Sequence, residues 1–277
     1  MPEPTFTFGL VPHVNDDATW AALGELCSLV SDHAHIHVQP HFAASPATLA
    51  DAIERGEVQL AWVSPTLLLL SEHLGTTVPL LSAVRQGVTF FHALLFVPRA
   101  SPITTVEETA GHSVAWVART SASGYIVPRL GLARRGIDLQ SHFGRQLLCD
   151  SHAAVAWKVH RGEADIGATY GVFEQGDPDR ALVKSGFRDF VPELDARVVD
   201  ITGPIHSDMI IADPRVPTPE RTAFAAALAH VSREPQGAKA VHTVMGADEF
   251  RPFSHQALSE LAELIAAGRK VGAVDPT

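Results

Sequence analysis

The stretch VAWVARTSASGYIV, from Val114 to Val127, decides how this chain is interpreted. It predicts an apolar strand, then a hydroxyl-rich turn, then a helix. Ser121 or Ser123 can N-cap that helix, because a serine oxygen accepts a hydrogen bond from a backbone N–H of the first turn. The helix is expected to run to about Arg135 and to end at Gly136. The stretch therefore predicts one strand–turn–helix unit of an α/β protein.

The turn itself is a candidate anion site. The first N–H groups of a helix have no acceptor within the helix, and the helix dipole places partial positive charge there. Hydroxyls at Thr120, Ser121 and Ser123, with Gly124 allowing close approach, suit a small oxyanion. The alternative is an ordinary serine cap that binds nothing, and the stretch alone favours that alternative.

Towards the N-terminus, strand and helix patterns alternate. Strands are expected near 5–11, 35–40 and 58–63, each followed by a helical pattern, which predicts a parallel sheet with helices on both faces. Ligands of such sheets bind at the carboxyl ends of the strands. The chain leaves those ends at Pro12–Asn15, Phe42–Ser45 and Ser64–Thr66.

Two segments of the chain resemble each other without gaps. Ser45–Val63 (SPATLADAIERGEVQLAWV) and Ser151–Thr169 (SHAAVAWKVHRGEADIGAT) share a capping serine, an Arg-Gly-Glu helix end and a buried strand. We interpret them as equivalent parts of two α/β lobes. Two such lobes predict a ligand cleft between them, since clefts between domains are favoured ligand sites.

Composition excludes several classes of protein. The chain has 277 residues, 46% hydrophobic and 19% charged, which predicts a globular protein of about two domains. Its net charge of −10 argues against nucleic acid and acidic membranes as partners. The sequence contains no apolar stretch of about 18 residues, so no transmembrane helix is predicted. The N-terminus shows no signal peptide, so we expect a cytoplasmic protein or one whose signal was removed.

No cofactor, metal site or catalytic residue is expected. Recognisable nucleotide, zinc-protease and serine-hydrolase motifs are absent from the sequence, and its two cysteines have no metal spacing. His33, His35, His37 and His41 gather around one expected strand, where a surface metal site is one interpretation. An exposed polar edge is the better interpretation, because no carboxylate or cysteine has matching spacing.

Several motifs together resemble the phosphate/phosphonate/phosphite solute-binding proteins of ABC importers. The resemblance runs from Phe8 to about Phe253. It rests on RGEVQLAWVSP from Arg55, Ser101-Pro102-Ile103, SASGY from Ser121, SHAA from Ser151, GEAD from Gly162 and IHSD from Ile205.

The resemblance implies a two-lobed periplasmic-binding-protein fold of type II, each lobe a mostly parallel sheet flanked by helices, with the ligand cleft between lobes. Lobe one would be 1–97 plus 205–277, and lobe two 98–204. In the family, a Ser-Thr-Ser-Gly turn holds the phosphonate oxygens, and here Ala122 replaces its threonine. The family's Ser-His pair matches Ser151 and His152, and Phe91 stands where an aromatic residue is common.

The expected function is a solute-binding protein that closes on a small oxyanion for an ABC importer. Its partners would be that ligand and an ABC permease, in the periplasm or at a lipid anchor if a signal was removed. The alternatives are a cytoplasmic enzyme of the same fold acting on a carboxylate metabolite and a ligand-sensing protein. The expected ligand-binding residues are Thr120, Ser121, Ser123, Gly124, Ser151, His152, Tyr170, Ser64, Thr66 and His13.

Overall fold

The structure is a computed structural model that describes residues 3–12, 16–71 and 73–270. Its internal contacts divide the chain into two units. Unit 1 comprises the described residues of Met1–Thr89 and Ser207–Ser254, and unit 2 those of Phe90–His206 and His255–Thr277. The expected lobe boundaries stay a prediction; the last helix, assigned with 205–277 to lobe one, packs within unit 2.

Unit 1 is built on a mixed six-stranded sheet with the order β12-β4-β11-β3-β1-β2. β1 pairs in parallel with β2 and β3, whereas β11 and β12 pair antiparallel with their neighbours. The strands are β1 (Thr5–Leu10), β2 (His37–Phe42), β3 (Leu60–Val63), β4 (Val78–Val84), β11 (Met209–Ala212) and β12 (Glu249–Pro252). The helices are α1 (Asp17–Ala34), α2 (Pro46–Glu54), α3 (Pro65–Leu70), α7 (Thr218–Val231) and α8 (Pro235–Met245), with a 3₁₀ turn at His73–Thr76.

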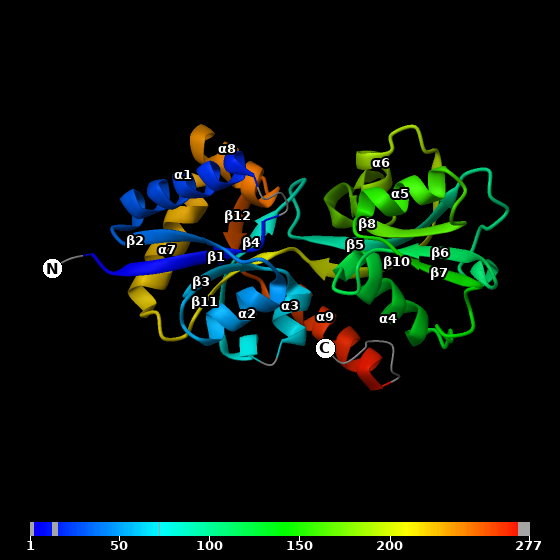
Figure 1. Ribbon diagram of the computed structural model, residues 1–277, viewed down its shortest axis with the longest axis horizontal. Coiled ribbons are helices and arrows are strands. Elements are labelled where there is room, and N and C mark those ends of the chain that lie inside the picture. Colours follow the sequence, from blue (N-terminus) through cyan, green and yellow to red (C-terminus); the bar gives the residue numbers. More distant parts are fainter. Residues whose placement is uncertain (1–2, 13–15, 72, 271–277) are drawn as a thin grey trace. The chain divides into compact units, whose positions relative to one another are not determined.

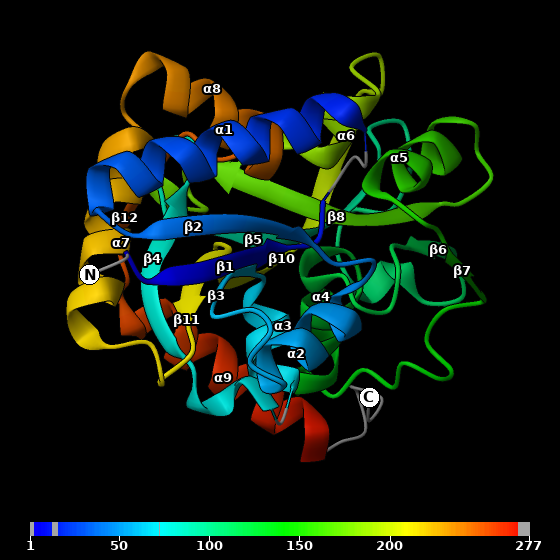
Figure 2. The same cartoon turned by 60° about the vertical axis from the view of Figure 1, so that its left-hand side comes forward.

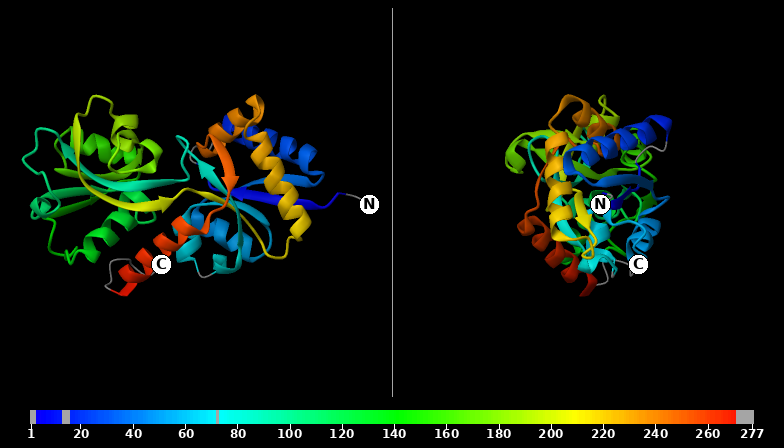
Figure 3. Two further views of the ribbon diagram at one scale, coloured as in Figure 1. Left: turned by 180° about the vertical axis from the view of Figure 1, so that it is seen from behind. Right: turned by 90° about the vertical axis from the view of Figure 1, so that its left-hand side faces the viewer.

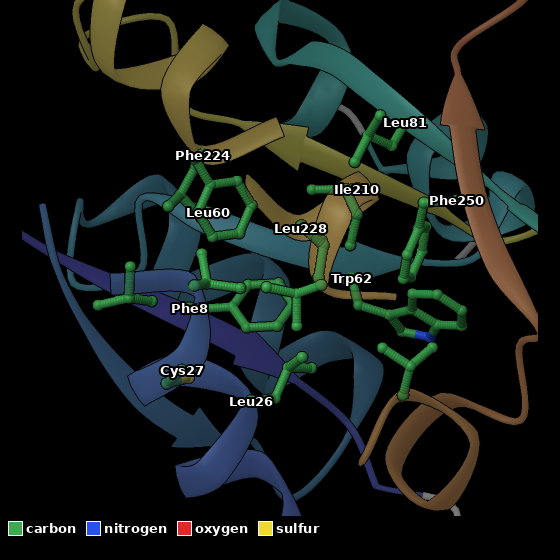
Figure 4. Packing of buried hydrophobic residues seen from close by; sticks show 14 of the residues in the cluster. Phe8, Leu26, Cys27, Leu60, Trp62, Leu81, Ile210, Phe224, Leu228 and Phe250 are labelled. Atoms are coloured by element: carbon green, nitrogen blue, oxygen red, sulfur yellow. The ribbon is translucent and has the colours of Figure 1, made fainter. Parts of the chain in front are cut away.

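The helices α1, α7 and α8 cover one face of this sheet and bury the main core of unit 1 (Figures 1 and 3). The rings of Phe8 and Phe224 lie 5.6 Å apart, and those of Trp62 and Phe250 lie 5.8 Å apart (Figure 4). The first pair joins β1 to α7, and the second joins the strands β3 and β12. Apolar area removed from water stabilises by roughly 25 cal/mol per Å², so both pairs contribute to the core of unit 1.

Unit 2 is built on a second mixed sheet, with the order β10-β5-β8-β6-β7 and β9 paired to β8. The helices α5 and α6 cover one face, and α4 and α9 lie on the other (Figure 2). The strands are β5 (Phe90–Pro98), β6 (Ser113–Trp116), β7 (Arg145–Leu148), β8 (Ile166–Phe173), β9 (Leu182–Ser185) and β10 (Ala196–His206). The helices are α4 (Val127–Arg134), α5 (His152–His160), α6 (Gly186–Phe190) and α9 (His255–Lys270), with short turns at Glu107–Thr109, Ala122–Ile126 and Glu174–Gly176.

The repeated unit of the sequence is confirmed in both sheets. Ser45 caps α2 and Ser151 caps α5, each accepting a hydrogen bond from the backbone N–H three residues on. Gly56 and Gly162 follow the two helices with φ of 73° and 70°, the left-handed conformation that favours glycine. Each unit therefore carries the same helix–glycine–strand element at its centre.

Three expectations differ from the structure. The sheets are mixed rather than mostly parallel, because strands β5, β10 and β11 return antiparallel. The strand β4 and the helix α8 were not predicted. His35 does not lie in a strand: it ends α1 with a φ of 53°, and β2 begins two residues later.

Within the described residues, no helix is both long and apolar enough to span a bilayer.

Candidate functional site

The turn after β6 is a helix start of unusual geometry. Ser121 is the N-cap, and its Oγ accepts a hydrogen bond from the N–H of Gly124 at 3.1 Å. The N–H of Ile126 donates to the carbonyl of Ser121 at 2.9 Å, so the first turn, Ala122–Ile126, is a π-turn that leads directly into α4. Such wide turns are rare in proteins, and those that occur are often found at functional sites. The cap expected at Ser121 or Ser123 is confirmed at Ser121.

Gly124 holds this turn against the end of the strand. A Cβ at position 124 would lie 2.3 Å from Cγ2 of Val117, which no side chain tolerates. The N–H of Val117 also donates to the carbonyl of Gly124 at 3.0 Å. The close approach that glycine allows here is therefore to the strand, and it positions the first-turn N–H groups relative to β6.

The second turn, after β7, places His152 at the start of α5. Ser151 caps this helix through a bond from the N–H of Ala154 to its Oγ at 3.1 Å. Nδ1 of His152 lies 3.0 Å from Oγ1 of Thr169, and the ring packs edge-on against Tyr170 with centroids 5.0 Å apart. Burial lowers the pKa of His152 to about 4, so its imidazole is neutral at physiological pH.

The strand β8 supplies the third part of the arrangement. Thr169 is fully buried, and the neighbouring Tyr170 donates its hydroxyl to Oδ2 of Asp189 at 2.6 Å. A hydroxyl that is already engaged by a carboxylate is less available to an anion than a serine hydroxyl. Tyr170 therefore contributes to the site through its ring, which packs against His152, and its hydroxyl oxygen is less available to a ligand.

The register of the sheet brings these three segments to one edge. Ala115 is opposite Gly167 on parallel β8, and Trp116 is opposite Leu148 on parallel β7. The carboxyl ends of parallel strands share an edge, which is where ligands of such sheets bind. The π-turn also contacts β8 directly. The sequence-predicted residues at this edge are Thr120, Ser121, Ser123, Gly124, Ser151, His152 and Tyr170.

Two residues of this edge were missed from the sequence. The sequence predicts Thr169 only as part of a strand. A hydroxyl inside an apolar run needs a hydrogen-bond partner when it is buried, and this was the available signal. Arg119 precedes the turn; its guanidinium lies 5.8 Å from the centre of the Tyr125 ring and donates to the Tyr125 hydroxyl at 3.3 Å. Arg129 stacks 4.7 Å from the same ring. These two cations put positive charge beside the turn in a chain of net negative charge.

The remaining predicted residues belong to unit 1. Ser64 caps α3, accepting from the N–H of Leu67 at 3.2 Å, and its Oγ lies 3.2 Å from that of Thr66. Thr66 is 2% exposed. Both follow the carboxyl end of β3, which is parallel to β1. His13 lies outside the described residues.

A groove of about 800 Å³ lies elsewhere in unit 2, between the far end of α4, β10 and α9. Its walls carry both signs of charge, with Arg134 and Arg135 at the C-terminal end of α4 and Glu260 and Glu263 on α9. Arg135 is already paired with Asp200. The groove contains none of the sequence-predicted ligand residues.

A protein-family model described as ABC transporter, phosphonate, periplasmic substrate-binding protein matches residues 8–258 of the chain. The match extends over both units and contains all ten predicted ligand residues.

Solved structures share the fold over nearly the whole chain. XAC2383 from Xanthomonas citri bound to ATP is 23% identical, with a TM-score of 0.77, and covers 98% of this chain and 99% of its own. PhnD1 from Prochlorococcus marinus in complex with methylphosphonate is 14% identical, with a TM-score of 0.68, and covers 99% and 100%. The aliphatic sulphonate binding protein SsuA from Escherichia coli is 14% identical, with a TM-score of 0.60, and covers 99% and 89%. The fold is thus that of the type II periplasmic binding proteins.

Proposed function

The chain belongs to the family of periplasmic substrate-binding proteins of phosphonate ABC transporters, and we propose that its unit 2 binds the anionic head of the ligand at the π-turn Ala122–Ile126. Membership makes the chain a substrate-binding component for phosphonate-type anions, and it favours solute binding over the enzyme and sensor alternatives. We place it in the periplasm or at a lipid anchor, with the permease of the transporter as its protein partner and without catalytic activity of its own.

The observation that carries this proposal is the convergence of two turns and the strand β8 on one sheet edge. The π-turn offers backbone N–H groups at the positive end of a continuous helix, and Ser121 and Ser123 add hydroxyls. Arg119 adds charge from the residue before the turn. An oxyanion at this edge meets several donors at once, which a single serine cap does not provide.

Neutral His152 fits the same role. With its Nδ1 on the hydroxyl of Thr169, the ring can carry its proton on Nε2 and donate it to a ligand oxygen. Because the low pKa keeps the ring neutral, this donor does not change its charge between pH 5 and 8. We propose that His152 donates a hydrogen bond to an oxygen of the ligand and does not neutralise the charge of the ligand.

The number of donors follows from the free energy of binding. Micromolar affinity corresponds to about 8.2 kcal/mol. Charge-assisted hydrogen bonds contribute roughly 1.5–3 kcal/mol each, and association costs at least about 4 kcal/mol. About five good donors are therefore required. Ser121, Ser123, His152 and two first-turn N–H groups supply that number.

The proposed ligand class is a phosphonate or a related tetrahedral oxyanion. A tetrahedral centre presents three oxygens to the hydroxyl, backbone N–H and imidazole donors of the two turns, whereas a carboxylate presents only two oxygens. Ala122 lacks the hydroxyl of the family's Ser-Thr-Ser-Gly turn, so the turn has one donor fewer for a fully charged dianion. We therefore propose that singly charged phosphonate esters and sulfonates compete with simple phosphonates at this site.

The test is the double substitution Ser121→Ala with Ser123→Ala, titrated with methylphosphonate, ethylsulfonate and phosphate by calorimetry. Loss of both hydroxyls should weaken binding at least 100-fold. Ser45→Ala is the control, because it removes a serine N-cap from α2 in unit 1, outside the proposed site. Unchanged affinity in the double variant would contradict the proposed site. An equal loss of affinity in the control would assign the loss to a less stable fold and not to missing ligand contacts.

A further inference from the structure

Three metal-ligating side chains meet on the surface of unit 1, away from both candidate turns. Nε2 of His230 lies 3.0 Å from Oε1 of Glu234, and Nε2 of His33 lies 3.8 Å from Oε2 of the same carboxylate. The two imidazole rings are 4.8 Å apart, inclined at 65°. One potential ligand atom from each of the three residues lies within 4.8 Å of the other two.

Packed helices hold the three residues. His33 lies in the last turn of α1, His230 in the last turn of α7, and Glu234 is the N-cap of α8. The helix α1 packs against both α7 and α8, and the three lie side by side in Figure 3. The backbone of Glu234 is bonded on both sides, to the carbonyl of Val231 and from the N–H of Ala238. The arrangement is thus fixed by the core of unit 1.

We propose that His33, His230 and Glu234 bind a divalent transition metal ion of the zinc type. Two imidazole nitrogens and one carboxylate are a ligand set that Zn²⁺ uses when a fourth position is left to water. Tetrahedral ligands at about 2.0–2.2 Å from zinc stand roughly 3.3–3.5 Å apart. The nitrogen–oxygen distances of 3.0 Å to Oε1 and 3.8 Å to Oε2 of Glu234 lie on either side of that value. Rotation of the side chains would present one carboxylate oxygen and both nitrogens to the ion.

The ion would join α1 to the α7–α8 turn. These segments are distant in the sequence, so binding restricts the unfolded chain more than a local site does. The nearest other cation on this turn, Arg233, is engaged by Glu249 at 3.0 Å. The carboxylate of Glu234 is therefore directed to the two histidines, which must be neutral to coordinate.

The experiment uses tag-free full-length protein stripped with EDTA and titrated at pH 7.5 with Zn²⁺ by calorimetry and with Co²⁺ by visible absorption. We expect one equivalent of Zn²⁺ to bind, tetrahedral Co²⁺ bands to appear, and the melting temperature to rise by roughly 5 °C at 100 times the dissociation constant. Mg²⁺, which prefers oxygen ligands, should have no effect.

The variants His33→Gln, His230→Gln and Glu234→Gln should each weaken Zn²⁺ binding at least tenfold. All three side chains are partly exposed, and the melting temperature of each metal-free variant shows whether it folds. His242→Gln, an exposed histidine on α8, is the matched control and should bind as the wild type does. Wild-type affinity in His33→Gln and His230→Gln, or no stoichiometric binding to the wild type, would overturn the proposal.

Discussion

Nδ1 of His152, in the first turn of α5, lies 3.0 Å from the hydroxyl oxygen of Thr169 on β8. Thr169 is fully buried, and burial lowers the pKa of His152 to about 4. A neutral imidazole has one nitrogen that donates and one that accepts, so its partner decides which nitrogen faces outward. The threonine hydroxyl therefore orients the ring that we propose as a ligand donor.

Replacing Thr169 with valine should weaken ligand binding about tenfold, because the ring loses the bond that sets its orientation. Calorimetric titration with the best ligand measures the loss, and the pH dependence of affinity should change as well. Thr109→Val is a matched control: its buried hydroxyl also contacts a histidine, with Oγ1 2.8 Å from Nε2 of His142. Equal losses in both variants would contradict an orienting role for Thr169.

Gly124→Ala should disrupt the π-turn, because the added Cβ would lie 2.3 Å from Cγ2 of Val117. Overpacking of this kind costs about 1–3 kcal/mol of unfolding free energy, and ligand binding should fall with it. The Cβ of Val117 would also lie 2.5 Å from the added carbon, so Val117→Gly in the same chain, which removes both clashing carbons, should restore part of the binding loss. Gly24→Ala on α1, where nothing lies within 4 Å of the added carbon, should be neutral or stabilising.

Two histidines with a lowered pKa, His92 and His152, make the stability depend on pH. Burial lowers the pKa of His92 from 6.5 to about 4, as it does for His152. Between these values the unfolded state binds more protons than the folded one. Stability therefore rises with pH in this window and is lost as the pH falls from about 6.5 towards 4, by up to about 1.4 kcal/mol per pH unit for each histidine.

His92→Phe tests this dependence outside the candidate site. His92 packs edge-on against Phe90 and Phe173, so a phenyl ring suits its surroundings. Urea unfolding between pH 4.5 and 6.5 should give a slope of free energy against pH that is smaller by up to about 1.4 kcal/mol per unit in the variant. An unchanged slope in His92→Phe would mean that this histidine is protonated in the folded state.

Local chemistry made part of the site predictable. Ser121 follows an apolar strand and precedes a helical pattern, and Gly136 closes that helix with a φ of 81°. The serines at 45 and 151 start their helices for the same reason, since a hydroxyl cap and a nearby glycine stop are short-range signals. The strand–helix order and the family resemblance then placed both turns after strands, and the sheet register confirms that placement.

Contacts between distant segments were not predictable in this way. The bond between His152 and Thr169 depends on which strands become neighbours in the sheet. No short stretch of sequence shows which strands pair or in which direction, so this contact could not be predicted. The same holds for His33, whose partners His230 and Glu234 come from the other end of the chain. Local spacing offers only other histidines near His33, without a carboxylate or cysteine at matching spacing, and therefore predicts no metal site there. The expected closure of two lobes on a ligand stays a prediction.

The last prediction concerns the charge beside the π-turn. Arg119 lies over the Tyr125 ring and precedes the hydroxyls of the turn, so its guanidinium raises the local potential for an incoming anion. Arg119→Gln should lower the affinity for a phosphonate about three- to tenfold and reduce its dependence on ionic strength, because exposed charges are screened over about 10 Å at 0.1 M salt.

Arg119→Lys separates charge from geometry, since it keeps the cation and loses the planar group that contacts Tyr125. Affinity near the wild-type value in Arg119→Lys, with a loss in Arg119→Gln, assigns the effect to charge. Arg161→Gln, on a cation stacked over Trp157 at the far end of α5, is the control and should leave binding unchanged. If Arg119→Gln and Arg161→Gln weaken binding equally, the loss comes from the change in net charge of the protein. That result would contradict a local role of Arg119 beside the turn.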